Sequence, residues 1–363
     1  MHELLVPGAA VVVRSSELGD WSTTFGTRAR GGRERVALGD HVRIGSNTKT
    51  MTGTVILQLV GERKLSLDDP IARFRPEVPN GANITITELL DMRSGLYNYS
   101  ESLELNQALD TTPQRVFAPD ELLAMAYKHP PYFAPGAGYH YSNTNTVLLG
   151  LVIEKLTGNR VEDEFRKRIF NPLGLKDTTF PARTSNAILD PHPNGYMFGS
   201  NVETLATQTL PPEQQARARA GTLQPADVTN DNPSWGWTAG AGISNAPDLA
   251  RYVQALVGGG LLDAPLQAQR LASMQPTEPS NPASASYGLG LAKLGPMYGH
   301  TGELPGYNSF MGYDPARKIT LVVWTSLSAA PDGQPPAIAL ARAVLARLYG
   351  ANPATPSPSG ATP

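Results

Sequence analysis

The sequence predicts an α/β protein in which both ends of the chain form one domain and a mostly helical domain is inserted between them. Strand patterns occupy the start of the chain, and helical stretches with Pro- and Gly-rich loops fill residues 62–230. Strand patterns return after residue 286. We therefore expect an α/β domain from residues 1–60 and 234–350, an inserted helical domain at 61–233, and a disordered Pro/Ala/Ser/Thr-rich tail at 351–363.

The first part of the chain predicts two strands and a buried helix. Residues 9–14 and 21–26 have strand composition and are separated by a polar turn, so we expect them to pair. In residues 46–60, apolar side chains recur at helical spacing, and the opposite face carries Thr and Leu instead of charges. This helix should therefore be buried almost all round, and Gly61 is placed to end it.

The later elements follow the same reasoning. Apolar residues between Val147 and Leu156 lie on one broad helical face, with Gly158 as the stop. Residues 181–233 show no periodicity, and a long excursion of this kind in a compact domain usually borders a site. Strands are predicted at 287–293, 297–302, 309–313 and 319–326, and a final amphipathic helix at 338–348.

Composition excludes several classes of function. The 363 residues carry a net charge of −2, which gives no basic field for nucleic acid, and no apolar run of about 18 residues predicts a membrane span. The absence of cysteine removes disulfides and thiolate chemistry. The six histidines show no metal-ligand spacing and no phosphate-cradling glycine loop is present, so we expect no metal and no cofactor.

The first candidate for chemistry is Ser46-Asn47-Thr48-Lys49 at the start of the buried helix. Positions i and i+3 share a helix face, so the Lys49 amine can reach the Ser46 hydroxyl. A hydroxyl needs a base to act as a nucleophile, and a lysine serves when burial populates its neutral form. An N-capped surface helix is the alternative interpretation, but an unpartnered lysine would be costly on a buried helix.

Two further motifs precede a helix and end a strand. In Tyr141-Ser142-Asn143, a tyrosine can relay a proton and an asparagine amide can hold a carbonyl, although a helix cap at Ser142 explains the tripeptide equally well. In His300-Thr301-Gly302, the glycine admits a substrate backbone and the threonine hydroxyl can bind a carboxylate, although an ordinary strand end has the same composition.

Together, the order Ser-x-x-Lys, Tyr-x-Asn, His-Thr-Gly resembles the penicillin-recognising serine hydrolases. The resemblance spans about residues 7–348 and is closest to the branch of class C β-lactamases, secreted D-alanyl-D-alanine carboxypeptidases and esterases. It implies a β-lactamase/transpeptidase-like antiparallel sheet flanked by helices. It also implies the following roles: Ser46 as nucleophile, Lys49 as base, Tyr141 as proton relay, Asn143, Trp235, His300, Thr301 and Gly302 in substrate binding, and the backbone N–H groups of Ser46 and Glu303 as the oxyanion hole.

One position departs from the carboxypeptidases. After Gly288-Leu289-Gly290-Leu291 they carry an arginine that holds the terminal carboxylate of the substrate, whereas this chain has Ala292. The following Lys293 would face the other way on a strand and cannot form a bidentate fork. This difference weakens the carboxypeptidase interpretation and strengthens the esterase one.

The resemblance sets the remaining expectations. We predict a D-alanyl-D-alanine carboxypeptidase-like enzyme of peptidoglycan metabolism, with a carboxylesterase, a class C-like β-lactamase and a non-catalytic penicillin- or peptidoglycan-binding protein as alternatives. The expected partners are small-molecule, stem-peptide or ester substrates, with β-lactams as covalent ligands. A monomer is expected. We expect a secreted or cell-envelope location with the export signal removed, and a cytoplasmic location as the alternative.

Overall fold

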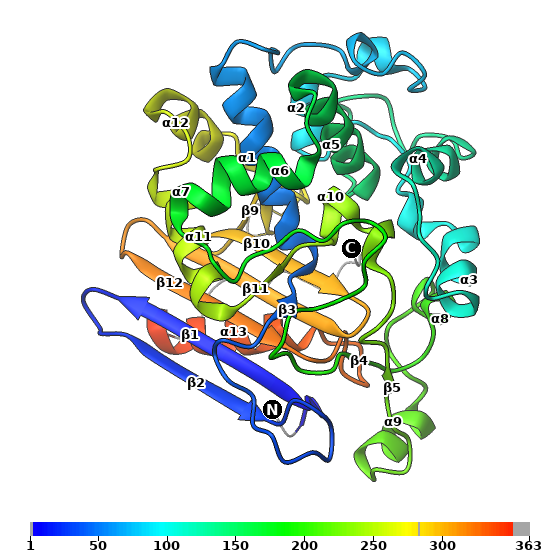
Figure 1. Cartoon of the computed structure of the whole chain (residues 1–363), viewed down its shortest axis with the longest axis vertical. Helices are drawn as coiled ribbons and strands as arrows, with labels where there is room; N and C mark the ends of the chain where they lie inside the picture. The colour runs from blue at the N-terminus through cyan, green and yellow to red at the C-terminus, as the bar shows by residue number, and fades with distance from the viewer. Residues whose placement is uncertain (1–2, 282–283, 351–363) are drawn as a thin grey trace.

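An eight-stranded antiparallel sheet joins the two ends of the chain in the computed structural model, which describes residues 3–281 and 284–350 (Figure 1). The strand order is β2-β1-β12-β11-β10-β9-β8-β7. The first register pair between the ends is Ala9 with Thr325. The strands are β1 (Gly8–Ser15), β2 (Trp21–Gly26), β7 (Gln275–Pro276), β8 (Ser286–Gly288), β9 (Leu291–Leu294), β10 (Met297–Leu304), β11 (Tyr307–Asp314) and β12 (Ile319–Thr325).

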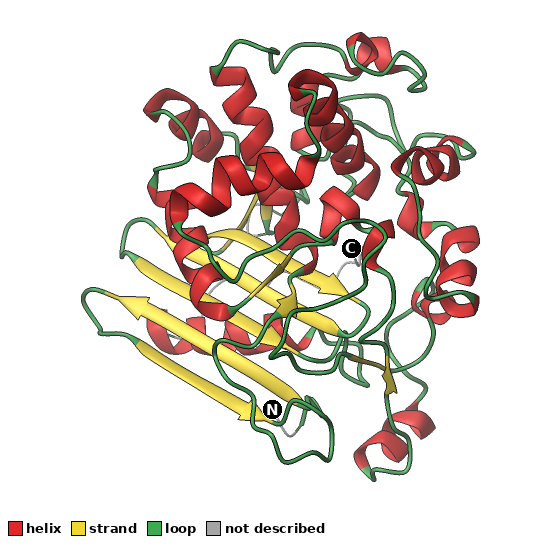
Figure 2. Cartoon of the chain, viewed as in Figure 1, coloured by secondary structure: helices red, strands yellow, loops and turns green. Residues whose placement is uncertain are grey.

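Helices cover both faces of this sheet (Figure 2). Helix α13 (Pro336–Tyr349) packs on one face of β11 and β12, and α11 (Ala246–Gly258) packs on β1, β11 and β12. Side chains alternate between the two cores along β12, where Leu321 and Val323 pack toward α13 while Val322 and Trp324 join the larger core. Burial on both faces explains why this strand is apolar throughout instead of alternating with polar residues.

The predicted buried helix is confirmed. A 3₁₀ turn at Gly45–Asn47 leads into α1 (Thr48–Gly61), in which every residue from Thr48 to Leu57 is buried. Helix α1 packs against α5 (Asn143–Thr157) and α10 (Trp237–Gly240). The predicted stop of α5 is also confirmed, since Gly158 takes the left-handed φ of 70° that favours glycine.

Most of the remaining helices lie between α1 and α10 along the chain. They are α2 (Ile86–Leu90), α3 (Leu103–Thr111), α4 (Pro119–Tyr127), α6 (Val161–Phe165), α7 (Asn171–Leu173), α8 (Asn201–Thr204) and α9 (Pro212–Arg219), with α12 (Ala264–Ala272) following α11. Two small sheets pair β3 (Val42–Arg43) with β6 (Ile243–Ser244) and β4 (Tyr196–Met197) with β5 (Ala226–Asp227). The predicted division into two domains is not tested by this arrangement and stays a prediction.

The aperiodic segment 181–233 is held by a buried arginine. The Nη2 of Arg43 donates to the carbonyl oxygens of Asn186, Thr229 and Asp231 at 2.7, 3.3 and 3.2 Å. Backbone carbonyls without regular secondary structure need such donors when they are buried. The segment is therefore fixed against the molecule although it has only short helices and strands.

Two predictions are corrected or fall outside the structure. The strand predicted at 287–293 is a hairpin, β8 and β9, whose turn contains Gly290 with φ of 61°. A Cβ at Gly290 would lie 3.0 Å from Gly53 Cα, so the turn packs directly on α1 and cannot continue as one strand. The predicted disordered tail at 351–363 lies outside the described residues.

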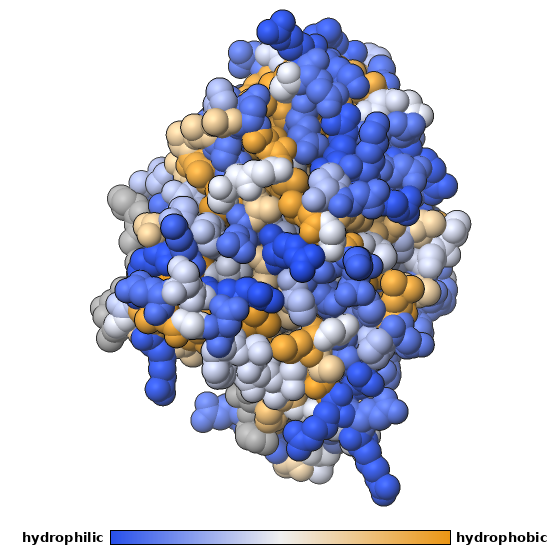
Figure 3. Space-filling model, turned by 60° about the vertical axis from the view of Figure 1, so that its left-hand side comes forward, coloured by the Kyte–Doolittle hydropathy of each residue, from blue (hydrophilic) through white to orange (hydrophobic). Residues whose placement is uncertain are grey.

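The visible surface in Figure 3 is mostly hydrophilic, with apolar side chains in several separate groups. None of the helices in residues 3–281 and 284–350 is long and apolar enough to cross a membrane.

Candidate active site

Ser46 and Lys49 meet at the N-terminal end of α1. Ser46 lies in the 3₁₀ turn that precedes the helix, and Lys49 follows one turn later. The Lys49 Nζ is 3.0 Å from the Ser46 Oγ. The sequence-predicted pair is therefore within hydrogen-bond distance, in a helix that is buried on all sides.

The surroundings of Lys49 favour its neutral form. Burial lowers the pKa of its amine well below the usual 10.5. The Nζ lies 2.6 Å from Asn143 Oδ1 and 2.8 Å from the Ala239 carbonyl oxygen, and both are acceptors. A neutral amine has two N–H groups, which these two acceptors occupy. Its lone pair is then left to accept the Ser46 proton.

Asn143 is oriented by a residue that the sequence did not single out. Its Nδ2 donates to Ser100 Oγ at 2.9 Å, which directs its Oδ1 toward Lys49. Its backbone N–H donates to Asn98 Oδ1 at 3.0 Å. Nothing in the pattern around residues 98–100 signals this contact, because it joins the 3₁₀ turn at Tyr99–Glu101 to a helix that begins more than 40 residues later.

Tyr141 stands beside this pair with a protonated hydroxyl. The Lys49 Nζ is 4.7 Å from the centre of the Tyr141 ring. Burial raises the pKa of Tyr141 well above 10, and the neighbouring Ser46 hydroxyl offsets part of that rise. Among the described residues the Tyr141 hydroxyl has no hydrogen bond of good geometry. It therefore remains a phenol with a proton to give. Ser142 occupies the N-cap position of α5, but its hydroxyl makes no capping hydrogen bond.

His300 is neutral at this site. Burial, and after it the nearby Lys49, lowers its pKa to about 3. Its Nδ1 is 2.5 Å from the Thr301 carbonyl oxygen, which can only accept, so Nδ1 carries the proton. Its Nε2, 3.0 Å from the Tyr287 hydroxyl, is then the acceptor. The His-Thr-Gly segment thus brings no positive charge, and Tyr287 fixes the ring.

Two glycines allow strand β10 to touch the turn that holds Ser46. A Cβ at Gly302 would lie 1.9 Å from the Ile44 carbonyl oxygen, and a Cβ at Gly45 would lie 2.4 Å from the Glu303 backbone nitrogen. Gly45 also has a φ of 54°. This contact brings the backbone of Glu303 against the turn of Ser46, and the family resemblance implies that the N–H groups of these two residues are the oxyanion donors.

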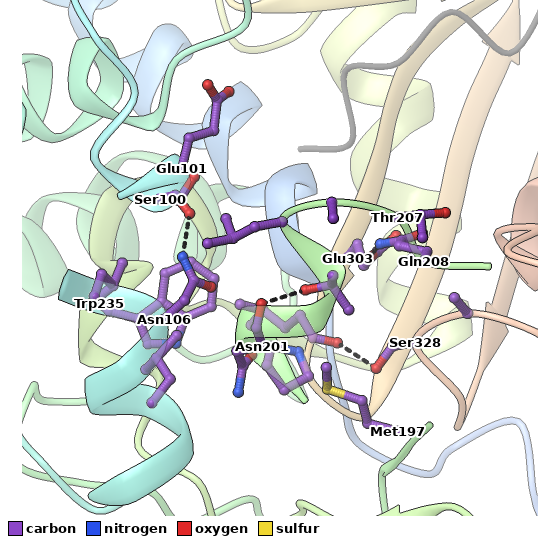
Figure 4. A pocket seen from close by; sticks show the side chains of 18 of the residues that line it. Ser100, Glu101, Asn106, Met197, Asn201, Thr207, Gln208, Trp235, Glu303 and Ser328 are labelled. Atoms are coloured by element: carbon purple, nitrogen blue, oxygen red, sulfur yellow. Dashed lines mark hydrogen bonds between the residues drawn. The ribbon is translucent and has the colours of Figure 1, made fainter. Parts of the chain in front are cut away.

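A cavity of about 510 Å³ lies beside these groups (Figure 4). Trp235 and Glu303 line it, and so does Ser100, which holds the Asn143 amide. Ser46, Lys49 and Tyr141 are not among its lining residues. The cavity is therefore a neighbour of the catalytic groups, on the side of Asn143 and Glu303.

Within the described ranges 3–281 and 284–350, no group of three or more His, Cys, Asp or Glu side chains is arranged to hold a metal ion.

A Ser–Lys pair at the start of a buried helix, with a tyrosine and a strand-borne His-Thr-Gly beside it, defines the class of active-site serine proteins whose members form acyl-enzymes. The family model described as "Beta-lactamase" matches residues 1–346. The chain therefore belongs to the β-lactamase family, whose superfamily includes serine hydrolases and penicillin-binding proteins.

Relatives of several kinds are similar to the chain. A D-stereospecific amidohydrolase from Streptomyces sp. shares 30% identity and superposes with a TM-score of 0.79 over 96% of this chain and 95% of its own. The D-amino acid amidase of Ochrobactrum anthropi SV3, complexed with L-phenylalanine, shares 25% identity with a TM-score of 0.77 over 94% and 93%. The putative penicillin-binding protein PbpX of Bacillus subtilis is 26% identical over 78% of this chain, which spans only 61% of its length.

Proposed function

We propose that the chain is a serine hydrolase that forms an acyl-enzyme on Ser46 and acts on amides or esters of D-amino acids. The observation that carries the proposal is the buried Lys49, whose Nζ lies 3.0 Å from Ser46 Oγ and also contacts two acceptors, Asn143 Oδ1 and the Ala239 carbonyl oxygen. Burial lowers the pKa of its amine well below 10.5. A lysine whose pKa is lowered by burial is a better acceptor for the Ser46 proton than a solvent-exposed lysine.

The geometry supports a two-step reaction. Lys49 takes the Ser46 proton while Oγ attacks the substrate carbonyl, and the backbone N–H groups of Ser46 and Glu303 stabilise the resulting oxyanion. Tyr141 donates its proton to the leaving amine or alcohol and regains one from Lys49, which leaves the acyl group on Ser46. Water then attacks the ester, releases the acid and restores the Ser46 hydroxyl.

The choice of D-aminoacyl amides rests on His300 and on residue 292, two positions where a carboxypeptidase would need a cation. A carboxypeptidase must hold the terminal carboxylate of its substrate, but His300 is neutral and residue 292 is alanine. The Lys293 Nζ lies over the Tyr298 ring, 4.8 Å from its centre. Two similar proteins support the same substrate class. They are the D-stereospecific amidohydrolase of Streptomyces sp. and the D-amino acid amidase of Ochrobactrum anthropi SV3.

A D-alanyl-D-alanine carboxypeptidase, as predicted from the sequence, is the second candidate. The observation that favours it is the His300-Thr301-Gly302 segment on β10, which reaches the Ser46 turn through Gly302. The Thr301 hydroxyl can bind a carboxylate without a cation. This candidate implies peptidoglycan as substrate, covalent labelling by penicillin and a location in the cell envelope.

A substrate panel tests both candidates. Turnover is measured for D- and L-alanine 4-nitroanilide, an N-acylated D-Ala-D-Ala peptide, nitrocefin and 4-nitrophenyl acetate, with Ser46→Ala as control. We expect the D-anilide to be the best amide substrate and the L-anilide to react at least about tenfold more slowly. Preference for the D-Ala-D-Ala peptide would favour the second candidate. Penicillin labelling without turnover of any substrate would indicate a binding protein, and wild-type rates in Ser46→Ala would contradict the whole mechanism.

A further inference from the structure

The cavity beside Ser46 has an acidic lining. Two of its lining residues are glutamates, Glu101 and Glu303, and none is lysine or arginine. Its remaining walls are uncharged or apolar, apart from the imidazole of His140. A cavity with this balance attracts a cationic group and repels an anionic one.

The two carboxylates are not equally available. Glu101 accepts from the Tyr132 hydroxyl at 2.6 Å and from Asn98 Nδ2 at 3.1 Å, and the Nε2 of His140 lies 3.9 Å from it. It is already surrounded by partners. Glu303 makes no ion pair among the described residues, so its negative charge has no cation to balance it.

Two neutral amides hold the Glu303 carboxylate in place. Gln208 Nε2 donates to one oxygen and Asn308 Nδ2 donates to the other at 3.2 Å, and Figure 4 shows Gln208 and Glu303 side by side. A carboxylate can accept about four hydrogen bonds, so a further donor can still bind. Burial raises the pKa of Glu303 to about 7, and these two amides oppose the rise. The side chain is oriented but lacks the charge partner that its burial calls for.

The position of Glu303 along the cleft indicates which part of a substrate it meets. Its backbone nitrogen lies against the turn of Ser46, so its side chain begins next to the carbonyl under attack. The cavity is also the side on which Ser100 holds Asn143, the residue expected to bind the substrate amide. His300, three residues earlier on β10, is not among the residues that line the cavity. If a substrate carries a charge that meets Glu303 on this side, that charge is close to the acyl carbonyl. It therefore belongs to the α-substituent of the acyl group.

We propose that the cavity is a subsite for the free α-ammonium group of a D-aminoacyl substrate, with the Glu303 carboxylate as its counter-ion. The inference rests on the proposed function and extends it, since it restricts the substrates to acyl groups with an unblocked amine. Gln208 and Asn308 position the carboxylate, and Gln208 comes from the aperiodic segment 181–233.

A pair of matched substrates tests this inference. D-alanine 4-nitroanilide carries the ammonium group, and the D-lactic acid 4-nitroanilide replaces it with a hydroxyl of similar size. The measured quantity is the ratio of kcat/KM for the alanyl substrate over the lactoyl one. We expect a ratio above one in the wild type and a fall of about 10- to 100-fold in Glu303→Gln, because the variant keeps the size of the side chain and one acceptor oxygen but loses the charge. The control Glu213→Gln removes an exposed carboxylate from α9 and should leave the ratio unchanged.

The pH dependence of the wild type gives a second test that needs no variant. The ratio should rise between pH 6 and 7.5 as Glu303 loses its proton, and fall above about pH 8 as the substrate amine loses its own. A ratio that is flat over this range, or unaffected by Glu303→Gln, would overturn the inference. An equal fall of both substrates would assign Glu303 a structural role and overturn it too. If the wild type hydrolysed neither anilide, the proposed function itself would fail.

Discussion

Replacing Gly302 by alanine should damage the oxyanion hole without touching any side chain of the mechanism. The added Cβ would lie 1.9 Å from the Ile44 carbonyl oxygen, 2.5 Å from Ser309 Oγ and 2.8 Å from Asn47 Nδ2. The closest tolerable contact between carbon and oxygen is about 3.3 Å, so β10 and the Ser46 turn must separate by roughly 1.4 Å. A displacement of about 1 Å in positioning groups costs on the order of 10²-fold in rate, and we expect a loss of this size in kcat.

The assay compares kcat for 4-nitrophenyl acetate and D-alanine 4-nitroanilide in the wild type, Gly302→Ala and a control. Gly39→Ala is the matched control, because a Cβ there meets nothing within 4 Å. A structural probe such as circular dichroism shows that the fold is kept. If Gly302→Ala folded and retained wild-type kcat on both substrates, the close approach of β10 would not be what positions the Glu303 N–H, and the reasoning would be refuted.

Three further predictions concern the protonation states and hydrogen bonds of Lys49, His300 and Glu303. Lys49→Arg should slow acylation of Ser46 by about 10²- to 10⁴-fold in stopped-flow measurements, because arginine cannot accept a proton at neutral pH, and a near-normal rate would contradict Lys49 as base. Tyr287→Phe should lower the free energy of unfolding in urea by about 1–3 kcal/mol, because the buried Nε2 of His300 loses its donor, and unchanged stability would argue against that hydrogen bond. The pKa of Glu303 is raised to about 7, so its contribution to stability is present below about pH 4.5 and is lost as pH rises through about 7. Glu303→Gln should therefore raise Tm relative to the wild type more at pH 8 than at pH 5. An equal difference in Tm at both pH values would count against the raised pKa.

The catalytic pair could be predicted because its two members are close in sequence. A separation of three residues on a helix fixes the distance between Ser46 and Lys49 before any tertiary structure is known. The burial of α1 could likewise be predicted, because Lys49 is the single charged residue in its sequence. The family resemblance added Tyr141, Asn143 and His300, and the structure places all three in one site around Lys49 and Tyr287.

The rest of the site depends on contacts between distant segments, which leave no local pattern. The Ala239 carbonyl that binds Lys49 is a backbone group, so any residue type could supply it. Gln208 lies in an aperiodic segment 95 residues from its partner Glu303. The sequence predicts one strand at 287–293 instead of the hairpin at Gly290, because the apolar pattern continues through the turn. Monomeric state, location and domain division remain predictions from the sequence.

Glu303 connects the chemistry of the site to its choice of substrate. Its backbone is fixed against Ser46 by Gly45 and Gly302, and a backbone N–H is the same whatever the side chain, so the oxyanion donor can be kept while residue 303 varies. In the proposed binding mode, the side chain at 303 projects from β10 beside the acyl carbonyl of the substrate. A charge at this one position can change which acyl groups bind without disturbing the reaction, since Lys49 and Tyr141 act from α1 and from the residues just before α5. The family motifs therefore predict the reaction, and selectivity has to be sought at positions that they leave free.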